Sequence, residues 1–507
     1  MTAHLVITPV LLPLLTGVGL LLLRQQPPFL QRAVSIGSVF IQVILVCQLL
    51  ALVNQGDILT YSLGNWAAPF GIVLVADRLA IWMLLITALI ALFSLLYALL
   101  DVDKAGRHFH VLFQLQLFGL NGAFLTGDLF NLFVFFEILL IASYSLLLHG
   151  GGRLRTKAGL HFVVINLVGS TLFLFAVGML YGILGTLNMA DLALQVAALP
   201  AEHVPLIKVA GLLLFGVFAL KAALVPLYLW LPNAYAQTSA PVAALFAIMT
   251  KVGAYSILRV YTLIFGAEAG LTANLIEPWL LPLALLTLVI GMLGVVASTG
   301  LRQQTAYLVI ASVGTLLTAI GLNTQAGIAA GLYYLPHSTF AAAACFLLAN
   351  TIAVRRGEFI DRFESGPSLP HARLIGGLFF MTAILLAGLP PLSGFIGKFM
   401  ILKAALAHPQ LVWIMGIVLT TSLLALIALA RSGSLLFYKV QTVRGQAESA
   451  VPVPITREVL PIAGLLALCV VLVVWAGPVT GFLQLTAEQL LEPSFYIQAV
   501  MTLEKTP

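Results

Sequence analysis

Residues 218–259 read FALKAALVPLYLWLPNAYAQTSAPVAALFAIMTKVGAYSILR, and this stretch determines how the rest of the chain is interpreted. It is apolar enough to lie in a bilayer, yet it contains Lys221 and Lys251. Between the two lysines are Pro226, Pro232 and Pro241. A lysine at membrane depth is costly and usually faces the protein interior or a water-filled cavity. Prolines interrupt a membrane helix, which is tolerated where the freed backbone groups are buried in protein. Two buried cations beside a broken helix therefore indicate an ion pathway.

The composition of the whole chain is that of an integral membrane protein. Of its 507 residues, 61% are hydrophobic and 8% are charged, whereas a soluble domain has about 25% charged residues. The apolar runs are continuous, while the strands of a membrane barrel alternate apolar and polar residues over about ten positions. At about 20 apolar residues per span, the length predicts an all-α polytopic membrane protein with about 14 transmembrane helices.

The same composition excludes several functions. The net charge of +6 comes from Lys and Arg in short loops, as membrane topology requires, so we do not expect nucleic-acid binding. The three cysteines are isolated in apolar runs and lack metal-ligand spacing, which predicts neither a disulfide framework nor a metal site. The chain has no Gly-rich phosphate loop and no nucleophile with a base. We therefore predict no cofactor and no enzymatic activity in this chain alone.

The apolar runs predict fourteen helices in a single membrane domain, residues 1–507. They cover residues 3–23, 30–53, 72–100, 108–126, 129–149, 158–186, 206–229, 240–265, 275–298, 303–322, 327–353, 373–404, 410–438 and 456–483. Loops after the odd-numbered segments collect Lys and Arg, as at Arg302 and Arg355, and the positive-inside rule assigns such loops to the cytoplasm. Both termini are then expected on the outer, periplasmic side of a bacterial inner membrane.

Two of these segments combine a central helix breaker with a lysine. The seventh has Lys221 before Pro226, and the twelfth has Lys398 after a group of breakers. This group consists of Pro390, Pro391 and Gly394. Paired broken helices in corresponding positions are typical of transporters built from inverted repeats. We expect two five-helix repeats, the fourth to eighth segments (108–265) and the ninth to thirteenth (275–438).

Glu137 and Lys221 are candidates for a buried ion pair. Glu137 is the only charged residue in the apolar run at 129–147. It is either a protonated acid hydrogen-bonded to a neighbouring helix or a carboxylate paired with a cation such as Lys221, and a pair of this kind can exchange protons. Lys221 could instead cap carbonyls freed by the break. Lys251 either extends its charged end to an interface or carries protons.

His337 and Lys398 extend this series along the chain. Histidine titrates near physiological pH and suits a proton relay, although a lone histidine can also be a hydrogen-bonded core residue. In chain order, Glu137, Lys221, Lys251, His337 and Lys398 form a candidate proton pathway. Interfacial positions are expected for the charged residues near predicted helix ends, Lys403, Asp128, Arg259 and Arg431.

Three segments carry a resemblance to a known family. They are TGDLFNLFVFFEILLIASYSLL at 126–147, the stretch 219–259, and AGLPPLSGFIGKFMILKAAL at 387–406. In these segments the chain resembles the antiporter-like membrane subunits shared by respiratory NADH:quinone oxidoreductase, membrane-bound hydrogenases and Mrp-type Na⁺(K⁺)/H⁺ antiporters. The resemblance covers nearly the whole chain. It implies fourteen helices with two inverted five-helix repeats, each containing a broken helix, and assembly with other subunits into a hetero-oligomer.

The resemblance also implies roles for individual residues. Glu137 and Lys221 match the family's glutamate and lysine of the fifth and seventh helices. Lys251 matches the central lysine of the eighth helix, His337 the histidine of the eleventh, and Lys398 the lysine of the twelfth near the exit. Together they would form the proton path of such a subunit.

Several positions make the chain look most like the D subunits of Mrp-type antiporters. Relatives in NADH dehydrogenases typically read LPDAH after the break, whereas this chain has Asn233 and Tyr235 in place of the acid and the histidine. Ala342 stands where relatives often have a lysine, so how protons pass this position is left open, and Arg302 replaces another lysine.

Two functions follow from the resemblance. The favoured one is a proton-translocating subunit of a Na⁺(K⁺)/H⁺ antiporter, coupled to monovalent cation export. The alternative is a proton-pumping subunit of NADH:quinone oxidoreductase or a membrane-bound hydrogenase, where electron transfer supplies the energy. Neighbouring genes would separate the two, since only the second requires iron–sulfur and flavin subunits.

Overall fold

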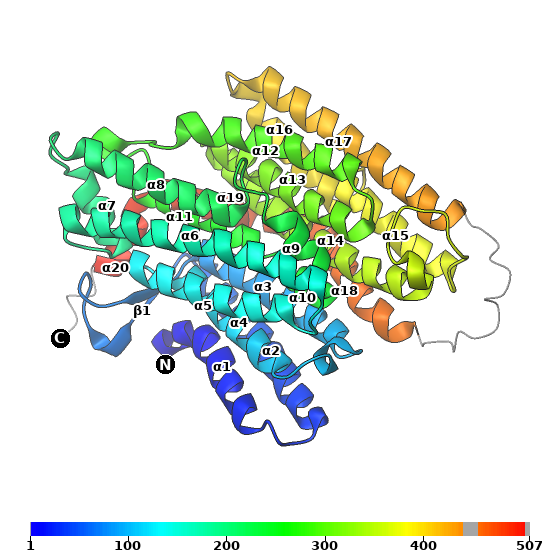
Figure 1. The fold of residues 1–507 in the computed structure, drawn as a ribbon. Helices are drawn as coiled ribbons and strands as arrows, with labels where there is room; N and C mark the ends of the chain where they lie inside the picture. The colour runs from blue at the N-terminus through cyan, green and yellow to red at the C-terminus, as the bar shows by residue number, and fades with distance from the viewer. Residues whose placement is uncertain (1, 440–454, 502–507) are drawn as a thin grey trace.

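A computed structural model describes residues 2–439 and 455–501 as a bundle of long helices (Figure 1). In these residues twelve helices are long and apolar enough to cross a membrane. Two shorter apolar helices, α4 (Phe109–Leu125) and α15 (Ala372–Ala387), accompany them. Each of the fourteen predicted segments overlaps one of these helices. The chain is thus a polytopic, mainly helical membrane protein.

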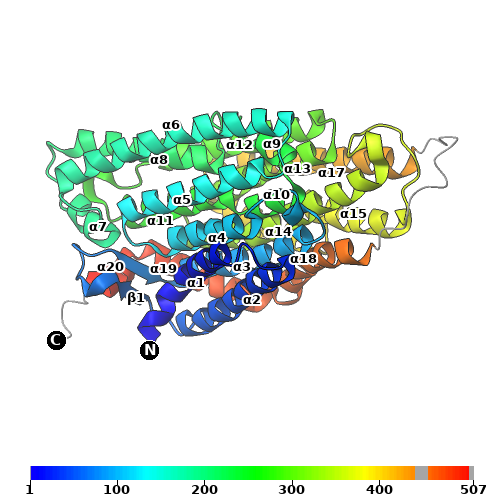
Figure 2. The same ribbon diagram turned by 60° about the horizontal axis from the view of Figure 1, so that its bottom comes forward.

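The helices follow one another along the chain, most of them with short connections. The first half contains α1 (Thr2–Leu22), α2 (Pro28–Val53), α3 (Arg78–Ala98), α4, α5 (Leu129–Leu148), α6 (Arg153–Leu184), α7 (Met189–Ala197), α8 (Val204–Ala222), α9 (Leu231–Gln237), α10 (Ala240–Phe246) and α11 (Met249–Leu263). The second half contains α12 (Glu277–Ala297), α13 (Leu301–Gly321), α14 (Gln325–Arg356), α15, α16 (Ser393–Ala404), α17 (Leu411–Gly433), α18 (Thr456–Val474), α19 (Ala476–Leu491) and α20 (Pro493–Met501). The first and last described helices, α1 and α20, both contact β1 (Figures 1 and 2).

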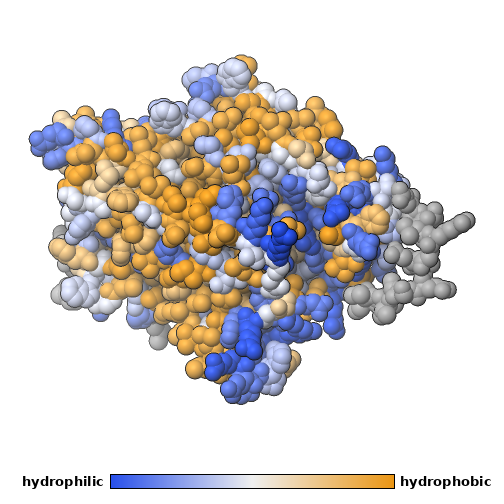
Figure 3. Space-filling view, in the orientation of Figure 1, coloured by the Kyte–Doolittle hydropathy of each residue, from blue (hydrophilic) through white to orange (hydrophobic). Residues whose placement is uncertain are grey.

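The middle of the bundle is formed by α10, α11, α13 and α14. The apolar window of the α10–α11 region is completely buried and that of α13 is 94% buried, compared with 28% for the region of α17. The outer helices expose their apolar side chains, and Figure 3 shows a broad hydrophobic area on the face that includes α6 and α8. An apolar exterior is expected where lipid or neighbouring subunits replace water.

Two helices are interrupted where the sequence predicts breaks. In the seventh predicted segment α8 ends at Ala222, and in the twelfth α15 ends at Ala387. The next residue is left-handed in both cases, with φ of 60° at Ala223 and 79° at Gly388. The amide that follows donates back across the last turn, from Leu224 to Ala219 O (2.9 Å) and from Leu389 to Ile384 O (3.1 Å). Both helices therefore close with the same hydrogen-bonded cap.

The predicted helix at 72–100 is wrong at its start. Residues Val73–Ala76 form strand β2, which pairs antiparallel with β1 (Leu59–Ser62). Asp77 then ends the strand and caps α3, because its side chain accepts a hydrogen bond from the amide of Ala80 at 2.9 Å. The four apolar strand residues adjoin the apolar helix, so hydropathy alone merges the two elements.

The predicted helix at 456–483 is also wrong, because it spans two elements. α18 ends at Val474 and α19 begins at Ala476. Pro478 has no amide hydrogen to donate to the carbonyl of Val474, and its ring would collide with that carbonyl in a continuous helix. The short helix α7 was not predicted; Asn188 caps it by accepting from the amide of Ala190 at 3.0 Å.

Candidate functional site

The first part of the site joins α5, α6 and α8. Glu137, on α5, accepts a hydrogen bond from the hydroxyl of Ser170 on α6. Lys221, one residue before the end of α8, is 6% exposed and donates to Oδ1 of Asn166 at 3.3 Å. In the described part of the chain no ion pair within 4 Å joins Glu137 to Lys221. The two charged groups are each bound to a neutral side chain of α6 instead.

The break after α8 leaves Lys221 free of a capping role. The indole Nε1 of Trp230 donates to Leu220 O at 3.1 Å. The amide of Val225, in the turn before Pro226, donates to Oγ1 of Thr287 at 3.0 Å. Groups freed by the break are thus satisfied by neutral partners.

Lys251 lies just after a second interruption, which was not predicted from the sequence. The expected helix at 240–265 is divided into α10 and α11, and Ala247 and Ile248 donate three residues back rather than four. Tyr235 explains this division, since its buried hydroxyl donates to Phe246 O at 2.7 Å and occupies that carbonyl. Lys251 itself is completely buried.

A small cavity connects Lys251 with the second repeat predicted from the sequence. The ammonium group of Lys251 donates to Oγ of Ser312 on α13 at 3.2 Å. Ser312 lines a cavity of about 20 Å³ together with His337, Ala342 and Lys398. This volume is sufficient for one water molecule. His337, Lys398 and Ala342 therefore line this cavity directly, and Lys251 is linked to it through Ser312.

Lys398 differs from Lys221 in its contacts. Its ammonium group donates to Ala387 O, at the end of α15, and to Oγ of Ser422 on α17, both at 3.0 Å. His337 Nδ1 lies 2.9 Å from Oγ of Ser393, the first residue of α16. Both side chains are therefore held at the second break.

Three of the predicted breaker residues fall inside or beside that break. Pro390 and Pro391 connect α15 to α16, and Gly394 lies in the first turn of α16. A Cβ at Gly394 would lie 2.8 Å from Nε2 of His337 and would collide with Leu385 O. Glycine at this position gives the histidine ring its space.

Lys221 and Lys251 are connected through the backbone rather than through a hydrogen bond. They lie on α8 and α11, and these helices touch at Gly253, where a Cβ would collide with the nitrogen of Ala222. Among the described residues no hydrogen bond joins the two lysines. The structure thus brings the predicted residues together in two groups, one around Glu137 and Lys221 and one around Lys251, His337 and Lys398.

Arg259, for which an interfacial position is expected, is buried in the protein and paired with a carboxylate. Arg259 is 4% exposed, and its guanidinium binds both carboxylate oxygens of Asp77 at 2.6 and 2.7 Å. The rings of Tyr255 and Tyr496 lie 5.6 and 5.2 Å from the guanidinium carbon. Asp77 is 182 positions away in sequence, so only the tertiary structure identifies this pair.

The other charged residues near helix ends occupy less buried positions. Lys403 and Arg431 are exposed at the ends of α16 and α17. Asp128 caps α5 by accepting from the amide of Asn131 at 2.7 Å. Burial raises the pKa of Asp128, and this capping hydrogen bond partly opposes the increase.

A polar cluster anchors the segment that follows the first break. His149, in the loop after α5, has Nε2 2.9 Å from Val102 O, and its own carbonyl accepts from Arg155. Arg155 also donates to Gln237 O, at the end of α9, at 3.1 Å. Burial lowers the pKa of His149, while its hydrogen bond to Val102 acts in the opposite direction.

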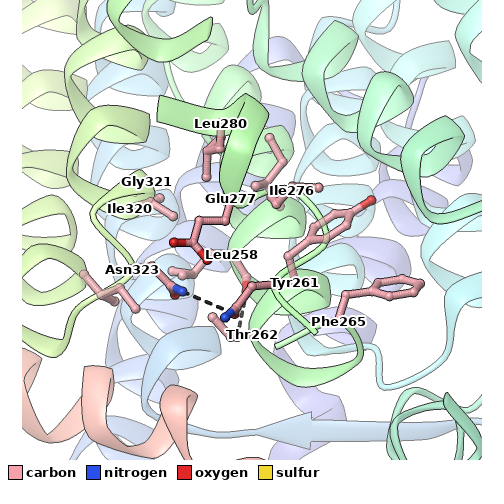
Figure 4. Close-up of a pocket in the computed structure, with 13 residues that line it drawn as sticks. Leu258, Tyr261, Thr262, Phe265, Ile276, Glu277, Leu280, Ile320, Gly321 and Asn323 are labelled. Atoms are coloured by element: carbon pink, nitrogen blue, oxygen red, sulfur yellow. Dashed lines mark hydrogen bonds between the residues drawn. The ribbon is translucent and has the colours of Figure 1, made fainter. Parts of the chain in front are cut away.

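A separate cavity of about 40 Å³ lies at the far end of α11. Figure 4 shows residues that line it, among them Glu277, Asn323, Thr262 and Tyr261. Asn323 Nδ2 donates to Oδ1 of Asn274 at 3.3 Å. None of the five pathway residues predicted from the sequence lines this cavity.

Comparison with known proteins identifies the family. The family described as NADH:quinone oxidoreductase/Mrp antiporter, TM, matches residues 126–425. The chain is 41% identical to the D subunit of a probable K⁺/H⁺ antiporter of Rhizobium meliloti, with 98% of each chain covered. It is 39% identical to the D subunit of the Na⁺/H⁺ antiporter of Alkalihalophilus pseudofirmus, covering 98% of this chain and 99% of the relative.

A solved structure supports the same assignment. A chain in the Mrp complex of a Dietzia species superposes with a TM-score of 0.86 at 27% identity, covering 98% of this chain and 99% of that one. The family match extends over more than half of the sequence, and both relatives align over nearly their full length. The chain belongs to the NADH:quinone oxidoreductase/Mrp antiporter transmembrane family.

Proposed function

We propose that this chain is the proton-translocating subunit of a multi-subunit Na⁺(K⁺)/H⁺ antiporter in a bacterial inner membrane. Relatives at 39–41% identity are named as D subunits of K⁺/H⁺ and Na⁺/H⁺ antiporters. The alignments extend over at least 98% of those chains, so the likeness is not confined to one region. The partners of the chain are then the other subunits of the antiporter complex.

The observation that carries the proposal is the hydrogen bond from Lys251 to Ser312, a residue that lines the central cavity. Lys251 donates to Ser312, and Ser312 shares a water-sized cavity with His337 and Lys398. A water molecule there supplies the step across Ala342 that a side chain supplies in relatives. Protons pass from the Glu137–Lys221 group to Lys251, and from Lys251 through this cavity to Lys398.

The chemistry required of this path is reversible protonation. Buried lysines lie at intervals along it, and each binds a proton more weakly once its neighbour is charged, because like charges repel in a medium of low dielectric. Proton movement in one direction is then coupled to cation movement elsewhere in the complex. No covalent intermediate is needed.

The matching helix breaks support an architecture of inverted repeats. Fourteen helices would span the membrane, with residues 108–265 and 275–438 as the two five-helix units and both termini on the outer side. The equal caps at Ala223 and Gly388 fit two related breaks, one in each unit. Broken helices of this kind concentrate transport sites near the bilayer midplane.

Transport by the whole complex in membrane vesicles tests the proposal. Lys251→Met should reduce cation-driven proton flux about 100-fold or more, in the range typical of a lost proton-transfer group. Lys403→Met is the matched control, because Lys403 is exposed at the end of α16 and should leave flux unchanged. Full flux in an assembled Lys251→Met complex would exclude this path.

The energy source and the transported ion are tested in the same vesicles. Gradients of Na⁺, K⁺ and Li⁺ should each be compared with and without NADH. An antiporter subunit predicts flux that follows the cation gradient and ignores NADH. Flux that requires NADH would instead assign the chain to a redox-driven pump.

A further inference from the structure

Helix α6 presents two polar side chains, one turn apart, to the Glu137–Lys221 group. Asn166 and Ser170 are 1% and 5% exposed. Their neighbours Leu167 and Val168, on another face of α6, are 59% and 54% exposed. An i, i+4 spacing places two side chains on the same face of a helix, one above the other. The two polar residues thus lie on the buried, mainly apolar face of α6, and their presence there needs an explanation.

Each member of this pair binds a different charged group. The hydroxyl of Ser170 donates to Oε1 of Glu137, and Oδ1 of Asn166 accepts from Nζ of Lys221 at 3.3 Å. The carbonyl of Asn166 lies 3.5 Å from the same ammonium nitrogen. The carboxylate and the ammonium group are thus kept on separate partners, although they carry opposite charges and Lys221 is buried while Glu137 is partly buried.

The amide of Asn166 is fixed in the orientation that receives Lys221. Its Nδ2 donates to Phe162 O at 2.9 Å, one turn earlier on α6. This bond determines which end of the amide faces the lysine, because only the oxygen can accept from an ammonium group. Rotation of the amide would place an N–H donor against Lys221 and would be unfavourable.

We propose that Asn166 and Ser170 are positioning residues that hold Glu137 and Lys221 apart and so set the balance between a separated pair and a contact ion pair. This inference rests on the proposed proton pathway. A contact pair stabilises the charged lysine strongly at low dielectric, which retains its proton. Hydrogen bonds to neutral groups stabilise it less, so the separated pair releases the proton toward Lys251 more readily.

Removal of either neutral partner should favour the contact pair. Ser170→Ala frees the carboxylate, and Asn166→Leu frees the ammonium group. Because a contact pair keeps Lys221 protonated, deprotonation then requires a higher pH, and the midpoint of the transport–pH profile should move upward. We expect a shift of about one pH unit and about tenfold slower flux at neutral pH, the scale of one hydrogen bond to a charged group.

Two variants serve as controls for the whole antiporter complex in vesicles. Ser170→Thr keeps the hydroxyl and should restore a near-normal midpoint. Thr171→Ala changes an exposed neighbour whose hydroxyl bonds only to Leu167 O, and it should not move the midpoint. If Asn166→Leu fails to assemble, Ser170→Ala and Asn166→Ser still test the two contacts separately.

Infrared difference spectroscopy gives a readout that a purely structural role would not change. The carboxyl band of Glu137 is assigned by its loss in Glu137→Gln, and it should shift in Ser170→Ala but not in Thr171→Ala. Unchanged midpoints and an unchanged band in the Ser170 and Asn166 variants would overturn the positioning role. Full flux in Glu137→Gln would instead overturn the proton pathway itself, so the two failures are distinguishable.

Discussion

The two helix breaks have the same backbone geometry but are completed by different side chains. Each closes with a left-handed residue, Ala223 after α8 and Gly388 after α15. At the first break the indole of Trp230 donates a hydrogen bond to the carbonyl of Leu220. At the second break the side chain of Lys398 donates a hydrogen bond to the carbonyl of Ala387. One lysine is therefore part of a cap, whereas the lysine at the other break is not.

This difference separates two roles that a buried lysine can have. Lys221 donates its hydrogen bonds to Asn166, so its proton can leave without exposing a helix end. Lys398 stabilises the end of α15 by donating a hydrogen bond to Ala387 O, which both the charged and the neutral amine can do. Deprotonation of Lys398 leaves two hydrogens for its two acceptors, Ala387 O and Ser422 Oγ, and therefore need not open the break. The cap at the end of α15 therefore requires the Lys398 side chain but not its positive charge.

The largest effect should come from removing the two lysines. Lys221→Met and Lys398→Met should each reduce proton flux about 100-fold or more. Lys398→Met should also loosen the end of α15, because it leaves the carbonyl of Ala387 without its donor, whereas Lys221→Met removes a donor from Oδ1 of Asn166 and should leave the end of α8 closed. Hydrogen exchange of the amides at the two helix ends measures this difference. Equally fast exchange at both ends would contradict the assignment of the cap to Lys398 alone.

Exchanging glycine and alanine at the two left-handed positions should change the stability of the protein in opposite directions. Gly388→Ala should destabilise the protein by about 1–2 kcal/mol, the cost of a left-handed residue with a Cβ. The added Cβ would also lie 2.9 Å from Cδ of Lys398. Ala223→Gly should instead be neutral or stabilising by up to about 1 kcal/mol, because glycine carries no such cost. Chemical denaturation measures the change in the free energy of unfolding of each variant. Changes of the same sign in both would refute the equivalence of the breaks.

The two breaks differ at the second residue after the left-handed one, where only the first break has a backbone amide that needs an acceptor. Val225 donates to Thr287, whereas the corresponding residue of the second break is Pro390, which has no N–H. Thr287→Val should therefore lower stability by about 1 kcal/mol. Thr382→Val is the matched control, since its hydroxyl bonds only within α15. A loss as large in the control would show that the contact to Val225 contributes nothing.

The smallest effect concerns the anchor of the segment after the first break. Burial lowers the pKa of His149, so the folded protein holds this ring neutral below the pH where it titrates when unfolded, about 6.5. Its contribution to stability is present above that pH and is lost as the pH falls below it. His149→Gln should flatten the decrease in melting temperature between pH 7 and 5. The exposed His161→Gln should leave the slope unchanged, and an unaltered slope in both would exclude His149 as its source.

The sequence predicts the membrane helices well, since each is a continuous apolar run near the length of a span. Prolines beside lysines also identify both breaks. Other features leave no local signal. The strand Val73–Ala76 has the hydropathy of the helix after it, and the interruption before Lys251 depends on Tyr235 from another helix. The ion pair of Asp77 and Arg259 joins residues far apart in sequence.

The candidate site shows the same division between local and tertiary information. Glu137, Lys221 and Lys251 stand out because a charge in an apolar run is rare. Asn166 and Ser170 do not stand out, because uncharged polar residues are common in membrane helices. Their role is visible only from their partners in the fold, Lys221 and Glu137. Ser312 was likewise not predicted, and only the packing of α13 against α11 identifies it as the partner of Lys251.

Gly253 has a consequence for how the site moves. It leaves the backbones of α8 and α11 in direct contact beside Lys221 and two residues after Lys251. Side chains can absorb small displacements by changing rotamer, but two touching backbones cannot. A displacement of the end of α8 should therefore displace α11 as well. Lys221 and Lys251, which lie beside this contact, should then move together.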